Sequence, residues 1–280
     1  YIKRRAVLRE RVGDGIIIIF GNNDTPMNYP ANTYHFRQDS TFLYYTGLTR
    51  DGLVLVINCE TGEEVLFGND ISLDDIVWMG FTPSVADMAA ESGIAKSRTM
   101  NELKDWVLAR LGDNHLHYLP PYRHDIMMQM AELTALPASQ LRTMASLQLI
   151  KAVVDQRAVK SAEEIAEIER ACAVGYEMHT TAMRMCRPGV TEREIAGAIE
   201  GIALGKGGGV SFPSIVTMHG EIQHGYPNAK PLEAGKLLLC DCGAETLGCY
   251  ASDNTRVMPI SGKFTQRQKD IYTRVKNAHD

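Results

Sequence analysis

Strand and helix patterns follow one another in a different order in the two parts of this 280-residue chain. Up to about residue 150, short apolar runs rich in β-branched residues alternate with segments of helical periodicity. The clearest strand is the run Ile16–Phe20. This alternation favours an α/β domain with a mixed sheet. We expect further strands at 52–57, 63–67 and 117–119, and helices at 3–12, 84–92, 101–111 and 123–134.

Two capping boxes mark the second part of the chain. In Ser161–Glu164 and in Thr191–Glu194, a hydroxyl and a carboxylate three residues apart can close the first turn of a helix. Antiparallel strands should follow the two helices, which is an α+β pattern. We therefore place one domain at 1–150 and a second at 151–280, with a linker between 148 and 160. The strands are expected at 215–218, 236–241 and 249–258, and a last helix at Thr265 and beyond.

Charge and hydropathy exclude several classes of protein. The formal net charge is −5, so the chain lacks the basic surface of a nucleic-acid-binding protein. No stretch approaches the roughly 20 apolar residues of a membrane span, and we expect no membrane partner. One basic run lies in the first expected helix, and we interpret it as a solvated helix face: Lys3, Arg4, Arg5, Arg9 and Arg11.

The six cysteines are scattered and form no Cys-x-x-Cys pair. Cys240 and Cys242 are separated by one residue, but no histidine or further cysteine follows at the spacing of a zinc site. This usage indicates reduced, buried thiols in a cytoplasmic protein.

Two carboxylates stand at the ends of neighbouring strand patterns. Asp241 ends the apolar run that begins at Leu237, and Asp253 lies within the next strand pattern. If the two faced each other across a hairpin centred on residue 247, their β-carbons would lie about 5 Å apart. Such a pair would repel without a cation, and carboxylate oxygens favour Mn²⁺ or Mg²⁺. The alternative is that Asp241 merely ends a strand and Asp253 is solvated.

Several motifs resemble those of the Xaa-Pro aminopeptidase and prolidase family, the pita-bread metallopeptidases. The hairpin motif comprises residues 241–245 and 250–256, and a related stretch continues through 259–268. Upstream, residues 211–217 and Gln223-His224-Gly225 resemble the substrate-side strand and histidine of that family. Residues 34–47 and 74–80 resemble the aminopeptidase P N-terminal domain.

The resemblance implies a fold and a site. Residues 1–150 would be an aminopeptidase P-type domain, and residues 151–280 the first half of an α+β pita-bread catalytic domain. Asp241 and Asp253 match metal ligands, Asp253 bridging two divalent ions, most plausibly Mn²⁺. His224 matches the histidine that contacts the scissile peptide, and Thr255 would orient a ligand carboxylate. The substrates would be peptides with proline at the second position, and the protein would be a homodimer or homotetramer.

The sequence departs from the family pattern in three ways. The two aspartates are one residue further apart than in many members, which predicts a larger turn or a β-bulge. Asn254 replaces an aliphatic residue. A histidine and two glutamates that complete the family's ligand set have no counterpart before Asp280. We therefore expect the chain to be a piece of a longer enzyme, inactive by itself.

Alternatives stay open at this point. The protein could be a prolidase acting on Xaa-Pro dipeptides, a creatinase-like hydrolase, or a non-catalytic peptide- or protein-binding member of the fold. Two further features have structural interpretations. Arg37, Gln38 and Asp39 would form a hydrogen-bond network or line a neighbouring subunit's site, and Trp78 would lie in the core or an interface.

Overall fold

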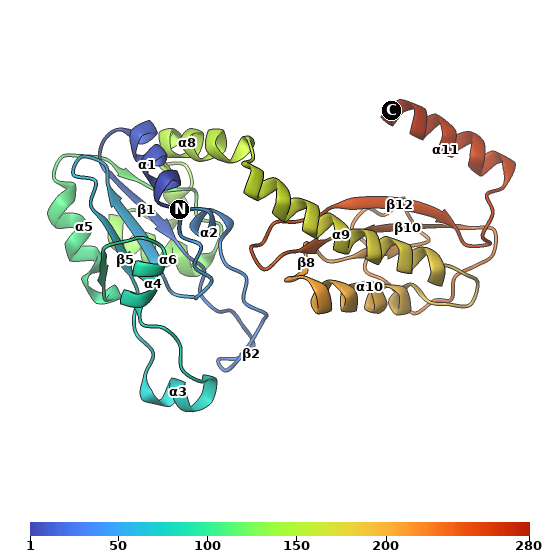
Figure 1. The fold of residues 1–280 in the computed structure, drawn as a ribbon, viewed down its shortest axis with the longest axis horizontal. Coiled ribbons are helices and arrows are strands. Elements are labelled where there is room, and N and C mark those ends of the chain that lie inside the picture. Colours follow the sequence, from blue (N-terminus) through green and yellow to red (C-terminus); the bar gives the residue numbers. More distant parts are fainter. The chain divides into compact units, whose positions relative to one another are not determined.

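The computed structural model describes all residues from Tyr1 to Asp280, and they form two compact units. The first unit is Tyr1–Val159 and the second is Lys160–Asp280. The segment expected to be a linker is instead helix α8 (Leu147–Ala158), which buries Leu149, Ala152 and Val153 in the core of the first unit. The boundary between the units therefore falls after this helix (Figure 1).

A five-stranded mixed sheet is the centre of the first unit, as the strand and helix alternation predicts. The strand order is β6-β5-β4-β1-β7. β1 pairs antiparallel with β4 and parallel with β7, and β5 pairs antiparallel with β4 and parallel with β6. The strands are β1 (Ile16–Phe20), β4 (Val54–Asn58), β5 (Glu64–Phe67), β6 (Lys96–Arg98) and β7 (Leu116–His117).

Helices cover both faces of this sheet, because successive strand residues point to opposite sides. Ile17 and Ile19 pack with α1, α2, α4 and α8 on one face. Ile16 and Ile18 pack with α5, α6 and α7 on the other. The helices are α1 (Ile2–Val12), α2 (Ser40–Thr46), α4 (Val85–Glu91), α5 (Leu103–Leu111), α6 (His124–Thr134) and α7 (Ala138–Leu141). The remaining elements are β2 (Pro26–Tyr29), β3 (Asn32–Thr33), α3 (Leu73–Met79) and the 3₁₀ turn Met100–Glu102.

One side chain of the first unit differs from expectation. Arg5 is fully buried, so the basic run of α1 is not a purely solvated face. Trp78, on α3, is 86% exposed, so of its two expected places the core is excluded. The network at Arg37–Asp39 is confirmed, since Gln38 is buried and accepts from the backbone N–H groups of Asn22 and Asp39.

The second unit packs two helices on one face of a three-stranded sheet (Figure 1). Both predicted capping boxes are present at the starts of α9 and α10. The strand order is β12-β10-β9, all antiparallel. The elements are α9 (Ala162–Met185), α10 (Glu192–Lys206), β8 (Gly209–Val210), β9 (Ile215–Thr217), β10 (Leu237–Cys242), β11 (Ala244–Glu245), β12 (Asn254–Pro259) and α11 (Gln266–His279).

Strand β10 separates a buried face from a more open one. Leu238, Cys240 and Cys242 are buried and join the core formed with α9 and α10. Leu239 and Asp241 are only partly buried and point to the opposite face. No helix in the structure is long and apolar enough to traverse a lipid bilayer.

Candidate metal centre

The hairpin of β10 and β12 sets the positions of the two aspartates. Asp241 lies opposite Thr255, and Cys242 lies opposite Asn254. The same register continues to the bridge between Glu245 and Ala251, so Asp253 comes opposite Gly243. The expected direct opposition of the two aspartates is therefore wrong.

The turn explains the difference. The backbone N–H of Thr246 donates to the carbonyl of Tyr250, and Cys249 between them has φ +58°. The hairpin is thus centred on residue 248, one residue later than expected, with a three-residue loop at 247–249. The register is the same on both sides of this loop, so the extra residue lies in the turn, where the left-handed Cys249 gives the geometry of a G1 bulge. The strand expected from residue 249 accordingly begins only at Asn254.

Asp241 and Asp253 are diagonal neighbours on one face of the hairpin. Strand alternation puts both on the side opposite Cys240 and Cys242. Diagonal neighbours have α-carbons about 7–8 Å apart and β-carbons somewhat closer, within reach of a shared ion or ion pair. Asp241 is half-buried and Asp253 is exposed, and neither forms an ion pair with a basic side chain.

Thr255 orients the carboxylate of Asp241. Its hydroxyl donates to Asp241 Oδ1 over 2.8 Å, as the sequence predicts. This bond fixes one carboxylate oxygen, and the second is not used by any hydrogen bond of the structure.

Gly243 permits the close approach of the two strands beside Asp241. A β-carbon at this position would lie 1.8 Å from the carbonyl oxygen of Ser252. The Ser252 carbonyl also accepts a hydrogen bond of 2.8 Å from the Ser211 hydroxyl. Any side chain at residue 243 would therefore force the strands apart where the carboxylates are placed.

His224 lies in the loop between β9 and β10, and its side chain is exposed. No hydrogen bond joins it to Asp241 or Asp253. The loop is held by Glu192, which is fully buried and accepts from the backbone N–H of Met218 at 2.7 Å and of Asn228 at 3.1 Å. The sequence does not reveal this role of Glu192, because an acidic residue in the first turn of a helix has an ordinary explanation in the helix dipole.

A second group of possible metal ligands lies on the other face of β10. His179 of α9 approaches Cys240 and Cys242, and the three ligand atoms lie within 4.8 Å of one another. The Cys240 thiol donates to Cys242 Sγ over 3.8 Å, and His179 Nε2 lies 3.5 Å from Cys242 Sγ. All three residues are buried.

The electrostatics of this group follow from these contacts. The hydrogen bond from Cys240, together with His179, lowers the pKa of Cys242 to about 6 against the effect of burial. The same bond and burial raise the pKa of Cys240. Contact with Cys242 raises the pKa of His179. Cys240 and Cys242 are free and buried, as expected, but the fold brings His179, a residue distant in sequence, next to them.

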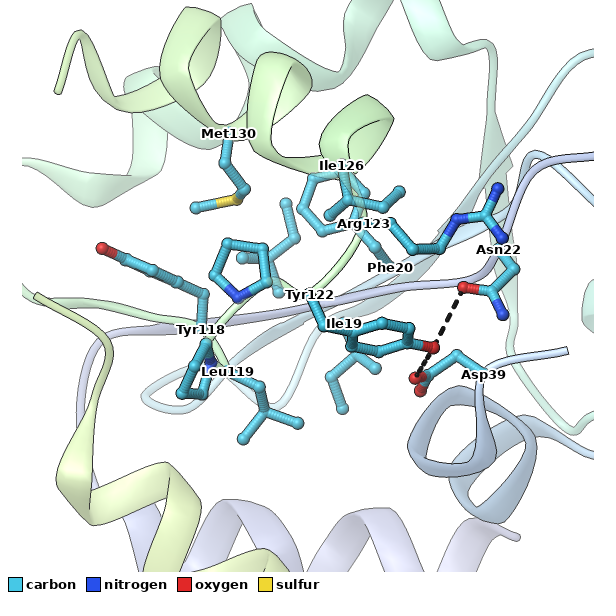
Figure 2. A pocket seen from close by; sticks show the side chains of 13 residues that line it. Ile19, Phe20, Asn22, Asp39, Tyr118, Leu119, Tyr122, Arg123, Ile126 and Met130 are labelled. Carbon is cyan, nitrogen blue, oxygen red and sulfur yellow. Dashed lines mark hydrogen bonds between the residues drawn. The ribbon is translucent and has the colours of Figure 1, made fainter. Parts of the chain in front are cut away.

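A pocket in the first unit has a different character (Figure 2). Figure 2 shows the Tyr122 side chain pointing toward Asp39 and Asn22, and its hydroxyl lies 3.0 Å from Asp39 Oδ2. Asp39 also caps α2 by accepting from the backbone N–H groups of Thr41 and Phe42. Asp39, Asn22 and Tyr122 are thus engaged in holding the fold, whereas the buried Tyr118 hydroxyl, which also lines the pocket, has no hydrogen-bond partner.

Comparisons with known protein families match both units. Residues 1–118 match the family described as aminopeptidase P, N-terminal domain. Residues 166–280 match metallopeptidase family M24.

Individual relatives agree with these matches. The Xaa-Pro aminopeptidase of Escherichia coli K12 is 30% identical over 285 residues, covering 96% of this chain and 64% of that protein. The structure of Pseudomonas aeruginosa aminopeptidase PepP superposes with a TM-score of 0.84 at 27% identity, covering 99% of this chain and 65% of that one. The low-pH form of E. coli aminopeptidase P gives a TM-score of 0.81 at 29% identity, covering 97% of this chain and 64% of that one. The chain thus spans slightly less than two thirds of each of these relatives.

Proposed function

The chain belongs to the aminopeptidase P group of the M24 metallopeptidases, with the pita-bread fold, and on this premise we propose that the whole protein is an Xaa-Pro aminopeptidase. It would hydrolyse the bond between the N-terminal residue and a proline at the second position. The relatives that bear this name cover both units of the chain, which favours this activity over that of a binding protein.

We propose Asp241 and Asp253 as metal ligands. The observation that carries this proposal is their diagonal placement on one hairpin face, with the Thr255 hydroxyl orienting Asp241. Both offer hard oxygen donors and neither is neutralised by a basic side chain, so the donor set fits Mn²⁺, our preferred ion. When bound, a pair of divalent ions supplies an acidified water and polarises the peptide carbonyl.

His224 is proposed to contact the peptide substrate. An exposed imidazole can donate to a carbonyl or accept from an N–H group of the peptide. Glu192 would limit the movement of the loop that carries it, because Met218 and Asn228 lie on either side of His224 in the chain. Its role is positioning, since it is buried and its carboxylate accepts hydrogen bonds from residues of this loop.

The experiment is a peptidase assay of the whole protein with Mn²⁺. We expect release of the N-terminal residue from an Xaa-Pro-Xaa tripeptide, loss of at least 100-fold in kcat/KM for Asp253→Asn, and little change for Asp270→Asn, an exposed matched control. Hydrolysis of Xaa-Pro dipeptides alone would favour the prolidase alternative. A folded protein without turnover or Mn²⁺ binding would contradict the proposal.

We further propose a cytoplasmic homodimer or homotetramer. The six cysteines are all free, which is consistent with a reducing compartment. On α3, Leu73, Val77 and Trp78 are each at least 80% exposed, as is typical of an interface. Light scattering of the whole protein tests the assembly, and a monomer at micromolar concentration would contradict it.

A further inference from the structure

The side chains of His179, Cys240 and Cys242 form a compact group of soft ligands that the proposed peptidase activity does not use. Cys240 and Cys242 are completely buried, and His179 is 6% exposed. The cysteines are two residues apart on β10, so both thiols point to the same face, toward α9. Asp241 lies between them in sequence but points to the other face.

Two of the three separations between ligand atoms match those of a tetrahedral zinc ion, and all three atoms lie within 4.8 Å of one another. With Zn–S bonds of about 2.3 Å and a Zn–N bond of about 2.05 Å, two thiolates lie roughly 3.8 Å apart, and a thiolate and an imidazole nitrogen roughly 3.6 Å apart. The observed separations are 3.8 Å between the two Sγ atoms and 3.5 Å between Cys242 Sγ and His179 Nε2.

The group has no further polar side-chain partner in its surroundings. His179 Nδ1 is buried without a side-chain partner, while Nε2 lies 3.5 Å from Cys242 Sγ, and the backbone of Asn254 lies close enough to influence the pKa of the ring. The two sulfurs are too far apart for a disulfide, whose S–S bond is about 2.05 Å. Both cysteines are free.

We propose that His179, Cys240 and Cys242 form a zinc site on the core face of β10, separate from the carboxylates on its opposite face. Thiolate and imidazole ligands select a thiophilic ion, whereas the carboxylate oxygens of Asp241 and Asp253 select a harder one. Strand alternation therefore gives one hairpin two sites of different metal preference.

Binding is balanced by proton release. All three ligands bind in their deprotonated forms, Cys240 and Cys242 as thiolates and His179 through Nε2 as the neutral imidazole, and any proton that they still carry is released to solvent. These three ligands leave one position of the tetrahedron for a water molecule. Because the group is buried, the ion enters during folding or when the hairpin opens.

The expected consequence is a rigid support for Asp241. An ion bound to Cys240 and Cys242 would fix the strand residues on both sides of Asp241 to α9. The zinc site would thus position the proposed ligand carboxylate without contacting substrate.

Cobalt substitution of the whole protein tests the site, because Co²⁺ on thiolates gives an intense near-ultraviolet charge-transfer band that carboxylate ligands do not give. We expect the wild-type protein to show this band and to lose it when one equivalent of Zn²⁺ displaces the Co²⁺. The band and the binding of this equivalent of Zn²⁺ should both be lost in Cys242→Ala and in Cys240→Ala. Both should be retained in Cys172→Ala, which replaces an exposed cysteine, and in Asp253→Asn.

The outcomes separate this site from the peptidase proposal. Retention of the band in Asp253→Asn, whether or not the protein cleaves peptides, supports a thiolate site independent of the carboxylates. If one cysteine variant fails to fold, the other one, compared with Cys172→Ala, decides whether the band comes from this site. A folded wild-type protein without the band, binding of Cu⁺ but not Zn²⁺, or a band that survives in a folded Cys240→Ala/Cys242→Ala double variant would overturn the proposal.

Discussion

Arg5 shows how a single charged side chain becomes part of the core of the first unit. It forms a 2.8 Å ion pair with Glu64 and donates to the carbonyl oxygens of Tyr45, Ser92 and Gly93. Its donors thus connect α1 to α2, β5 and the end of α4. A pattern of basic residues on a helix cannot reveal this, because the partners are distant in sequence.

Replacing Arg5 by methionine should destabilise the first unit by about 3–5 kcal/mol, since it leaves a partly buried carboxylate and several carbonyl oxygens without donors. Arg11→Met is the matched control on the same helix. Arg11 is exposed and pairs only with Asp155, so its loss should cost less than about 1 kcal/mol. Urea unfolding measures both, and equal losses would contradict the argument.

In the second unit, Gly243 is the residue on which we expect stability to depend strongly. Gly243→Ala should destabilise that unit by about 3 kcal/mol or more, because the added methyl group collides with backbone. Gly201→Ala, in the middle of α10 with no atom near the added group, should instead stabilise by about 0.5–1 kcal/mol. Thermal unfolding monitored by circular dichroism compares them, and an unchanged Tm for Gly243→Ala would refute the close approach.

At the scale of elements, local signals predicted most of the helices and strands. The two capping boxes located the starts of α9 and α10, because hydroxyl and carboxylate act within a single turn, and the helix expected at Thr265 begins there as α11. The apolar run at Ile16–Phe20 predicted β1 correctly. The register of β10 and β12 was not predictable to one residue, since it depends on the left-handed conformation of Cys249 in the turn.

Glu192 connects the start of helix α10 to the loop between β9 and β10. Glu192→Gln should weaken the charge-assisted bonds to the backbone of Met218 and Asn228 and raise the hydrogen-exchange rates of these two amides about tenfold or more. Glu194→Gln, in the same helical turn, alters only the exposed capping box of Thr191. It should leave the loop amides unchanged, and a similar increase in both variants would argue against a specific role for Glu192.

His117 couples β7 to α8 and makes the first unit sensitive to pH. Its Nδ1 atom lies 2.7 Å from the Ser146 hydroxyl, and burial lowers its pKa from the ordinary value of 6.5, partly offset by Asp14. The unfolded chain then binds the proton more readily, so stability is complete above pH 6.5 and decreases as the pH falls toward the folded-state pKa.

The measurement is the urea midpoint between pH 7.5 and 5. His117→Gln should show a smaller decrease than the wild type, whereas His115→Gln, at an exposed position two residues earlier, should retain the full decrease. Identical pH profiles for wild type and His117→Gln would show that other groups control the acid sensitivity.

At the scale of the whole molecule, the sequence predicts two domains and a family resemblance, but not the group formed by His179, Cys240 and Cys242. The family motifs are continuous in sequence and therefore visible there. The approach of His179 to Cys240 and Cys242 depends on the packing of α9 against β10, which no local pattern specifies.

Metal removal should affect the two units differently. Their cores share no residue, and the proposed ligands all lie in the second. Mn²⁺ at 100 times its Kd should stabilise the second unit by about 2.7 kcal/mol and leave the first unchanged. Calorimetry of the whole protein with EDTA or Mn²⁺ tests this, with Asp253→Asn as the control that should not respond. A Mn²⁺-induced shift of the first unit's transition alone would contradict the assignment.

Side chains of β10 alternate between the two faces of the sheet, and this alternation limits how the strand can change during evolution. Inserting or deleting one residue between Leu237 and Cys242 would rotate part of the strand by half a turn, moving the carboxylate inward and exposing thiols to oxidants. Length changes in the turn at 246–250 would spare both faces. Indels among related sequences should therefore accumulate at the tip of this hairpin and be absent from its central strand.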